Sequence, residues 1–536
     1  MTSDKTSERS QPRAEGTPRR ADLIVPPPRA KEAKVSKVTP LKPVGWLGYC
    51  IIILLTTICY LPLFQSDLVW SEHDQVERSP YQSMDTIAEA WTLQSIRHAD
   101  PLTISSYFLE SYSPLPDAPT HHGINLLLHI AAALTFLKVL EALKLPAAFS
   151  ASLVFALHPT VLQTIFWAGY RNELLGLVLI LAAMYFGIQN RSSRDYFMLI
   201  GLSVLACWIH PAAFLLPFIL ALCILHQKHY PKLRDFNHLL PIFCLALFIG
   251  LWSQGSSIDH ELTLSEEVGR ATQNFFFNLG QSLFPAELAL FYPLKASHGF
   301  STGAQYGFLP LLLLIPFYVL ILFNYKRPWA RSVFVGLTVY LLLSLPGWLR
   351  SGTFIDGEPA HEDHLHYVAL PFIVALFICA LGGVIRILGA GGRFIWYSGF
   401  SLFVLLQISF TLSFASSISD RTSLWKNLSE QWPDSWVPKL ALVESVQESD
   451  GATSPLTQTE MINIMESLVR IQPDLSSIRL ALARAYRADG QSSQALRNYR
   501  WILRQDYPGY EVLLEAAEFL EAMGLSWDAR NTRDRL

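Results

Sequence analysis

Carboxylates gather in the segment that follows the first hydrophobic run of this sequence. Residues 66–120 contain nine Asp or Glu side chains and only two basic ones, Arg78 and Arg97. Glu72 and Asp74 stand on either side of His73, shortly after the hydrophobic run ends at Phe64. A carboxylate held just above a membrane surface can take the proton of an acceptor hydroxyl in a reaction on a lipid-borne substrate. We therefore expect Asp74 or Glu72 to be the catalytic base.

Two further polar groups lie at the ends of hydrophobic runs. One is the turn 158–173, which contains Arg171, and the other is Glu362-Asp363-His364, a short distance after Arg350. A cation stabilises the charge that gathers on a leaving phosphate, and a guanidinium offers forked donors for it. We expect these residues to bind substrate: Arg171, His364, Glu362, Asp363 and Arg350.

Each group has a simpler alternative. The acidic segment is also compatible with a solvated outer loop, and Arg171 with an anchor that holds a helix end at the lipid headgroups. His129 and His158 lie on apolar faces, where histidines usually serve packing. A divalent metal site is a further alternative at Glu362, Asp363, His364 and His366, although no closed ligand spacing is evident. We therefore expect no resident cofactor and assign no metal ligands.

The composition is that of an integral membrane protein. Of the 536 residues, 51% are hydrophobic and 16% are charged, whereas soluble domains carry about 25% charged residues. The formal net charge of −3 argues against general nucleic-acid binding. All six cysteines lie in apolar runs, which predicts buried thiols and not disulfides.

Hydrophobic runs predict an all-α, polytopic membrane protein with about eleven transmembrane helices. The expected spans are 44–64, 121–143, 147–166, 171–188, 195–209, 211–227, 235–253, 304–324, 330–349, 366–388 and 394–416. Lys and Arg concentrate in alternate short loops, which marks those loops as cytoplasmic. The N-terminus is then cytoplasmic, and an odd number of spans places the C-terminus outside.

The sequence divides into three regions. Residues 1–43 are basic and rich in proline, and we expect a disordered cytoplasmic arm. Residues 44–416 form the transmembrane domain, with an outer loop at 65–120. In the extracytoplasmic region 417–536, Gly490 and Ala495 recur 34 residues later as Gly524 and Ala529. That period is typical of tetratricopeptide-type helical repeats, and an ordinary helical hairpin is the alternative.

Several short motifs resemble, in order, those of the transmembrane and tetratricopeptide-repeat proteins and their bacterial relatives, a family of protein O-mannosyltransferase-like enzymes. The motifs are Tyr112-Ser113-Pro114-Leu115, then His122, Asn125 and His129; His158-Pro159, Trp167, Gly169, Arg171 and Leu174-Leu175; Leu283-Phe284-Pro285, Leu288 and Tyr292-Pro293; Glu362-Asp363-His364 and Tyr367; and Leu424-Trp425 with Pro433-Asp434-Ser435-Trp436. Together they cover roughly residues 45–536.

The resemblance implies a GT-C glycosyltransferase fold, a polyprenyl-phosphate sugar as donor, and a bacterial inner (cytoplasmic) membrane location. It adds His122 and Asn125 to the expected substrate-binding residues, and it implies an acidic pair near Glu72 and Asp74. Three positions depart from the pattern: His73 separates the pair, Ser113 replaces an Arg, and Gln163 replaces an acid.

These observations predict a membrane glycosyltransferase that moves a sugar from a polyprenyl-phosphate donor to an acceptor hydroxyl on the outer face. Its partners would be the lipid-linked donor, a protein or glycan acceptor, and membrane lipids. Two alternatives remain. One is a non-catalytic scaffold whose repeats recruit partners, and the other is a transporter, which would place polar groups near the middle of the bilayer.

Overall fold

The computed structural model describes residues 44–66, 84–92, 100–110, 112–228, 230–253, 264–285, 288–290, 292–293, 312, 314–350, 360–361, 363–387, 389–418, 421–448, 456–473, 476–505 and 509–535. These residues are almost entirely helical, with one pair of two-residue strands. The all-α prediction is therefore confirmed for them. The arm expected at 1–43 lies outside the described residues.

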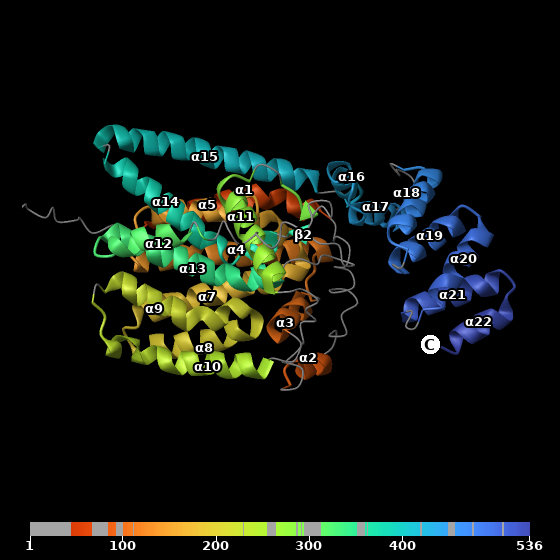
Figure 1. Cartoon of the computed structure of the whole chain (residues 1–536), viewed down its shortest axis with the longest axis horizontal. Coiled ribbons are helices and arrows are strands. Elements are labelled where there is room, and N and C mark those ends of the chain that lie inside the picture. Colours follow the sequence, from red (N-terminus) through yellow and green to blue (C-terminus); the bar gives the residue numbers. More distant parts are fainter. Residues whose placement is uncertain are drawn as a thin grey trace, which may run out of the picture. The chain divides into compact units, whose positions relative to one another are not determined.

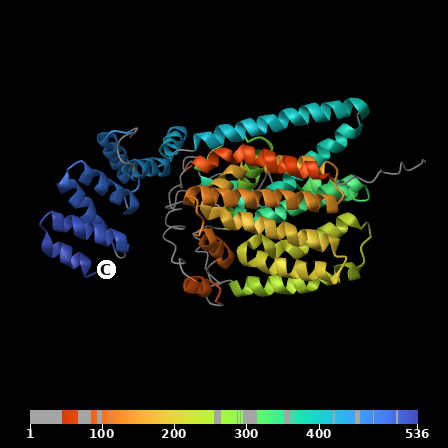
Figure 2. The same ribbon diagram turned by 180° about the vertical axis from the view of Figure 1, so that it is seen from behind.

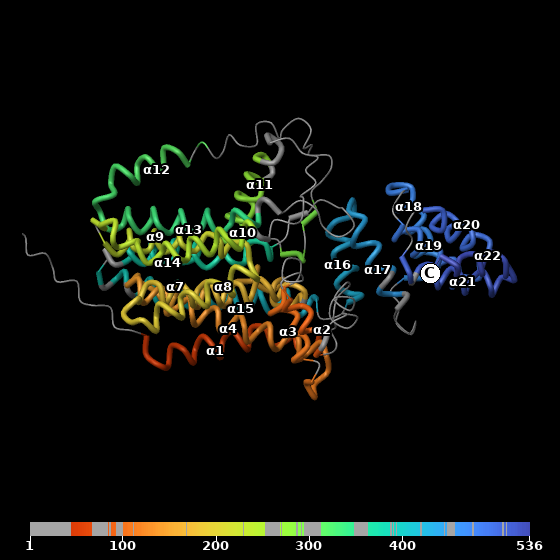
Figure 3. Tube along the Cα trace, turned by 90° about the horizontal axis from the view of Figure 1, so that it is seen from below, coloured from red at the N-terminus to blue at the C-terminus, as the bar shows by residue number. Residues whose placement is uncertain are grey.

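The first half of the chain builds a set of helices around α4 (Figures 1 and 2). α4 contacts α1, α5 and α7, and α7 packs closely on α8. In Figure 3, α1 and α4 run side by side. The elements are α1 (Trp46–Tyr60), η1 (Leu61–Gln65), α2 (Met84–Ala90), α3 (Pro101–Glu110), α4 (Asp117–Ala142), α5 (Ala148–Ala156), α6 (Val161–Phe166), η4 (Ala168–Tyr170), α7 (Arg171–Gln189) and α8 (Ser193–Ile209).

The following elements cover the other side of α5 and α7. α14 contacts α5, α13 and α15, and α13 contacts α9. The short strands β1 and β2 pair in antiparallel fashion, with Tyr292 opposite His361. The elements are η5 (Pro211–Leu215), α9 (Leu216–Gln227), η6 (Leu233–Leu239), α10 (Leu240–Ser253), α11 (Leu264–Leu283), β1 (Tyr292–Pro293), α12 (Leu314–Phe323), α13 (Pro328–Arg350), β2 (Ala360–His361), η11 (Asp363–His366), α14 (Leu370–Ile387) and α15 (Gly389–Ser417).

Six helical stretches of the described residues are long and apolar enough to cross a membrane. They are Trp46–Gln65, Asp117–Ala142, Arg171–Gln189, Leu233–Leu251, Pro328–Gly347 and Phe394–Ser417. Pro211–Gln227, Leu314–Phe323 and Leu370–Ile385 are shorter apolar helices. This supports an integral membrane protein, while the number of eleven spans stays a prediction.

The expected span 147–166 is divided into two short helices. α5 ends at Ala156 and α6 begins at Val161, and His158-Pro159 lies between them. Proline cannot donate a backbone hydrogen bond and clashes with the preceding turn of a helix, so the helix stops there. The break exposes backbone carbonyls, and the hydroxyl of Tyr60 donates to the carbonyl of His158 at 3.1 Å.

Two glycines allow the close contacts that position polar side chains. A Cβ at Gly176 of α7 would stand 2.7 Å from the Cβ of His210. The close approach lets the His210 ring reach Glu173, with 2.8 Å between Nε2 and Oε2. A Cβ at Gly347 of α13 would overlap the carbonyl oxygen of Leu365, so this glycine admits the turn η11.

The C-terminal helices form successive antiparallel pairs. α18 contacts α19, α19 contacts α20, and α21 contacts α22. Gly490 and Gly524 occupy the two equivalent turns with φ of +74° and +76°, a conformation that L side chains rarely adopt. The helices are α16 (Arg421–Gln431), α17 (Val437–Glu448), α18 (Gln458–Ile471), α19 (Ser476–Ala488), α20 (Ser492–Ile502), α21 (Tyr510–Ala522) and α22 (Ser526–Arg533).

Candidate functional site

Arg171 is the first residue of α7, and its side chain is completely buried. Its Nε donates to Oδ1 of Asn125 at 2.9 Å, and Nη1 donates to the hydroxyl of Ser106 at 3.1 Å. Nη1 also forms an ion pair with Glu110, and the guanidinium lies 4.5 Å from the ring centre of Tyr107. Arg171 is therefore not an anchor exposed to the lipid headgroups.

Glu110 is the residue that the sequence analysis missed. It lies at the end of α3 and is buried against both Arg171 and His121. In the sequence it is one of nine carboxylates in an acidic segment, and nothing in that segment sets it apart. Burying two charges is costly unless they are paired and hydrogen-bonded, so Glu110 and Arg171 depend on each other.

His122 and Asn125 both project from α4 toward the turn 165–167. The amide of Asn125 donates to the carbonyls of Ile165 and Trp167, at 3.1 and 3.4 Å. The His122 ring is stacked on Phe166, with 5.5 Å between centroids and 8° between planes. Asn125 thus connects α4, the turn and Arg171, whereas His122 contributes a buried ring beside the same turn.

The turn η11 brings His364 against Tyr170, the residue before Arg171. The rings of Tyr170 and His364 are stacked at 3.6 Å. The backbone N–H of His364 donates to Oε1 of Gln163 at 2.7 Å. Gln163 also donates to the carbonyl of Leu290. A carboxylate at position 163 could accept the first bond but could not donate the second, which explains an amide there.

Asp363 is buried and receives a hydrogen bond of 3.0 Å from the hydroxyl of Tyr292. Burial disfavours the charged carboxylate and raises the pKa of Asp363 to about 7, a rise that the Tyr292 bond opposes. Tyr292 comes from β1, so the β1–β2 pair positions this donor.

The structure describes four of the expected site residues only in part or not at all. Glu72, Asp74 and Glu362 fall outside the described residues. Arg350 ends α13, but its side chain is not among those described. Of the expected residues, the structure gathers Arg171, Asn125 and His122 around the turn 165–167, and it places His364, which follows Asp363 in η11, on the ring of Tyr170.

Three further histidines, His129, His158 and His366, are held in hydrogen-bonded contacts within the helical core. Nδ1 of His129 is 2.9 Å from the hydroxyl of Tyr367, and Nε2 of His158 is 3.2 Å from the carbonyl of Ser282. The Ser282 hydroxyl in turn lies 2.8 Å from Nε2 of His366. Among the described residues, no three His, Cys, Asp or Glu side chains are grouped so as to hold a metal ion.

An apolar cavity of about 260 Å³ lies beside this hydrogen-bonded chain. Its wall is formed by α5, α11, α14 and α15, and its few polar side chains are His158, Ser282 and Gln407. Phe377, Phe403, Phe410 and Phe284 supply much of the apolar lining. The cavity suits an extended hydrocarbon group whose polar end lies near His158 and Ser282.

Comparison with known proteins identifies one distant relative. The chain is 25% identical over 222 residues to the protein O-mannosyl-transferase F38B6.6 of Caenorhabditis elegans. The match covers 38% of this chain and 31% of that protein, so the chain spans about a third of the relative's length. No family model matches the chain. At this identity and coverage, the similarity supports at most a glycosyltransferase-like relationship.

Proposed function

We propose that this protein is a GT-C-type membrane glycosyltransferase that moves a sugar from a polyprenyl-phosphate donor to an acceptor hydroxyl. The observation that carries the proposal is the chain of contacts from the apolar cavity to η11. His158 and Ser282 line the cavity, Ser282 contacts His366, and His364 in the same turn is stacked on Tyr170. A lipid in the cavity would have its phosphate near η11.

In this proposal, Asp74 or Glu72 removes the proton of the acceptor hydroxyl. The acceptor oxygen forms a bond to the anomeric carbon of the sugar, and the bond from that carbon to the phosphate oxygen breaks. The electron pair leaves with the lipid phosphate, and the configuration at the anomeric carbon inverts. A carboxylate base and a phosphate site suffice for this step, so no metal is assigned to it.

The roles of the basic residues follow from their surroundings. Arg171 is already neutralised by Glu110, so we assign it to positioning the start of α7 and not to direct contact with phosphate. His364 and Arg350 would face the phosphate, with Asp363, Glu362, His122 and Asn125 completing the pocket. The partners would be the lipid-linked donor, a protein or glycan acceptor, and membrane lipids.

The arrangement in the membrane is part of the proposal. The 1–43 arm would be cytoplasmic, the 44–416 domain would contain the spans, and the 417–536 region would lie outside the bacterial inner membrane. There the tetratricopeptide-type pairs would position the acceptor. The pairs are joined by the ion pairs Arg484–Glu515 and Arg500–Asp528, at 2.7 and 2.9 Å.

The test compares carboxylate variants of the full chain in isolated membranes. We would measure transfer of labelled sugar from a polyprenyl-phosphate donor to the acceptors in those membranes. Mannose is the first sugar to try, because the relative is named an O-mannosyl-transferase. Asp74→Asn and Glu72→Gln, singly and together, are expected to reduce transfer by about 10²–10⁴-fold, the usual contribution of a general base.

Glu89→Gln is the matched control, because Glu89 belongs to the same acidic segment but is exposed on α2. It should transfer sugar at the normal rate. Full activity of the double variant at normal expression would refute the base assignment. If deletion of 430–536 abolishes function while the carboxylate variants retain it, the scaffold alternative is favoured.

A further inference from the structure

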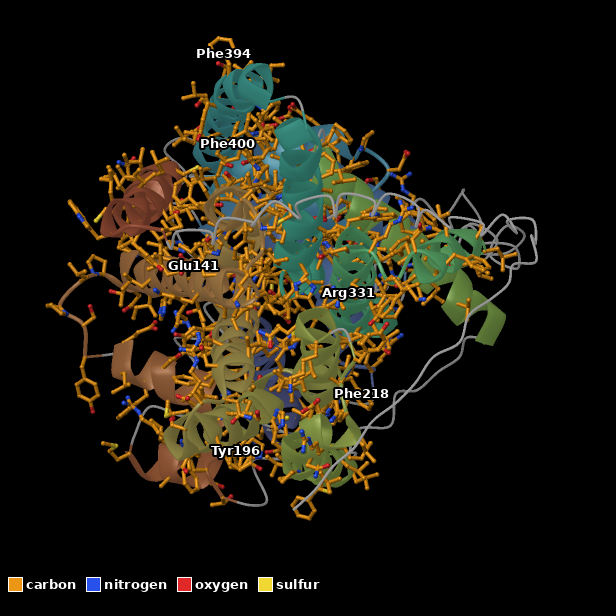
Figure 4. The ribbon with its side chains drawn as sticks, turned by 90° about the vertical axis from the view of Figure 1, so that its left-hand side faces the viewer. Glu141, Tyr196, Phe218, Arg331, Phe394 and Phe400 are labelled. Carbon is orange, nitrogen blue, oxygen red and sulfur yellow. The ribbon has the colours of Figure 1, made fainter. Side chains whose placement is uncertain are left out.

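A second cavity, of about 770 Å³, opens at the other end of the helices. It is lined by the turn 142–146 after α4, the ends of α7 and α9, and the start of α13. Because α7 begins at Arg171 and ends at Gln189, this cavity and the candidate site lie at opposite ends of the same helix. Figure 4 looks onto this end, where Glu141 and Arg331 project from different helices and Arg331 is nearer the centre.

Four basic side chains line this cavity: Lys144, Arg191, Lys228 and Arg331. No described residue of the lining is an Asp or Glu. Lys228 is paired with Asp235 at 2.8 Å, but within the described ranges no carboxylate lies within ion-pair distance of the other three. Nε of Arg331 is shielded from solvent and has no hydrogen-bond acceptor among the described residues. The cavity therefore has an excess of positive charge.

Basic residues near helix C-termini often serve only to hydrogen-bond the last carbonyls. Here the helix ends are closed by backbone bonds. The N–H of Leu145 donates to Leu140 at 3.0 Å, that of Asn190 to Phe186 at 2.8 Å, and that of Lys228 to Ile224 at 2.8 Å. Lys144 and Asn190 adopt left-handed φ values of 57° and 33° to complete two of these ends. The cations are not required as caps.

An apolar cavity of about 70 Å³ continues from the basic one. The two share Leu143, Leu145, His226 and Ser332 in their walls. The apolar cavity extends between α4, α9, α13 and α14, where Val139, Val335 and Phe372 line it. Trp329, half exposed at the rim of the basic cavity, is a residue type that favours the level of the lipid headgroups.

We propose that the basic cavity binds the phosphate of an anionic phospholipid, with the start of an acyl chain in the adjoining apolar cavity. Lys144, Arg191 and Arg331 supply charge-assisted hydrogen bonds to the phosphate oxygens. Basic pockets between transmembrane helices are sites where anionic headgroups bind. Inorganic phosphate has the same charged group but no chain, so it would leave the apolar cavity unused. This site is separate from the proposed sugar transfer.

The experiment uses the full chain in a neutral detergent. Phosphatidylglycerol, phosphatidylcholine or inorganic phosphate is titrated, and binding is followed by the rise in the thermal midpoint. Phosphatidylglycerol is expected to raise the midpoint, whereas phosphatidylcholine and inorganic phosphate at equal concentration should not. The Lys144→Gln/Arg331→Gln variant should bind phosphatidylglycerol about 30-fold more weakly, from ~1 kcal/mol for each cation.

The matched control is Arg194→Gln/Lys326→Gln, which removes two cations from exposed positions outside the cavity wall. Its affinity should stay within about threefold, because neither side chain lines the cavity and charges at a distance are screened by salt. An equal loss in both double variants would overturn the site in favour of general surface charge. An equal shift with inorganic phosphate would show a free-phosphate site, and no shift with any probe would also refute the proposal.

Discussion

Arg171 and Glu110 are buried partners whose charges offset each other at the start of α7. Arg171 has no exposed surface, and Glu110 is nearly as well shielded. Removing one member of such a pair leaves the other charge buried without compensation. Glu110→Gln is therefore expected to lower stability by about 3–5 kcal/mol. A lower thermal midpoint of the purified full chain would show this loss.

Exposed Glu89 again provides the control, since Glu89→Gln should leave the midpoint unchanged. The double variant Glu110→Gln/Arg171→Gln should lose less than the sum of the two single changes, because neither side chain is then charged. Additive losses, or a Glu110→Gln midpoint equal to that of the control, would mean that the pair does not stabilise the chain.

At the scale of helices, the hydrophobic runs predicted several of the long apolar helices. The runs at 121–143, 171–188 and 394–416 correspond to α4, α7 and α15. In the sequence, residues 158–166 fit both a span and a turn, because hydropathy does not register where a proline ends a helix. Arg171 and Asn125 could be selected from the sequence, but Glu110 could not. Its contact with Arg171 joins residues 61 positions apart, which local patterns do not encode.

The repeat-like helix pairs make a prediction about their turns. Gly490 links α19 to α20 in the left-handed region, and a side chain there costs about 1–2 kcal/mol. Gly490→Ala should therefore weaken this pair locally. Faster amide hydrogen exchange in α19 and α20 of the full chain would show this local weakening.

Gly509 provides the control, since its φ is −59° and no atoms lie near an added Cβ. Gly509→Ala should leave hydrogen exchange in α19 and α20 unchanged. Equal exchange in the two variants would contradict the argument.

At the scale of the whole molecule, a group of basic side chains lies at one end of the helices. Lys144, Arg191 and Arg331 lie at the end of α4 and α7 where the phospholipid site is proposed, and Glu110 and Asp363 lie at the end with the candidate active site. Lys and Arg in short loops favour the cytoplasmic side. An odd number of spans would then place the C-terminal helices on the other side of the membrane from the basic loops.

This topology predicts which introduced thiols react with a membrane-impermeant maleimide. In a variant whose six native cysteines are replaced by alanine, Ser193→Cys would mark the start of α8, next to Arg191, and Ser493→Cys would mark α20. Both serines are exposed, so local burial does not distinguish them. Ser493→Cys should be labelled in intact cells, and Ser193→Cys only after lysis. Labelling of both from the same side would require an even number of spans between them, and the reverse pattern would turn the proposed active site to the cytoplasm.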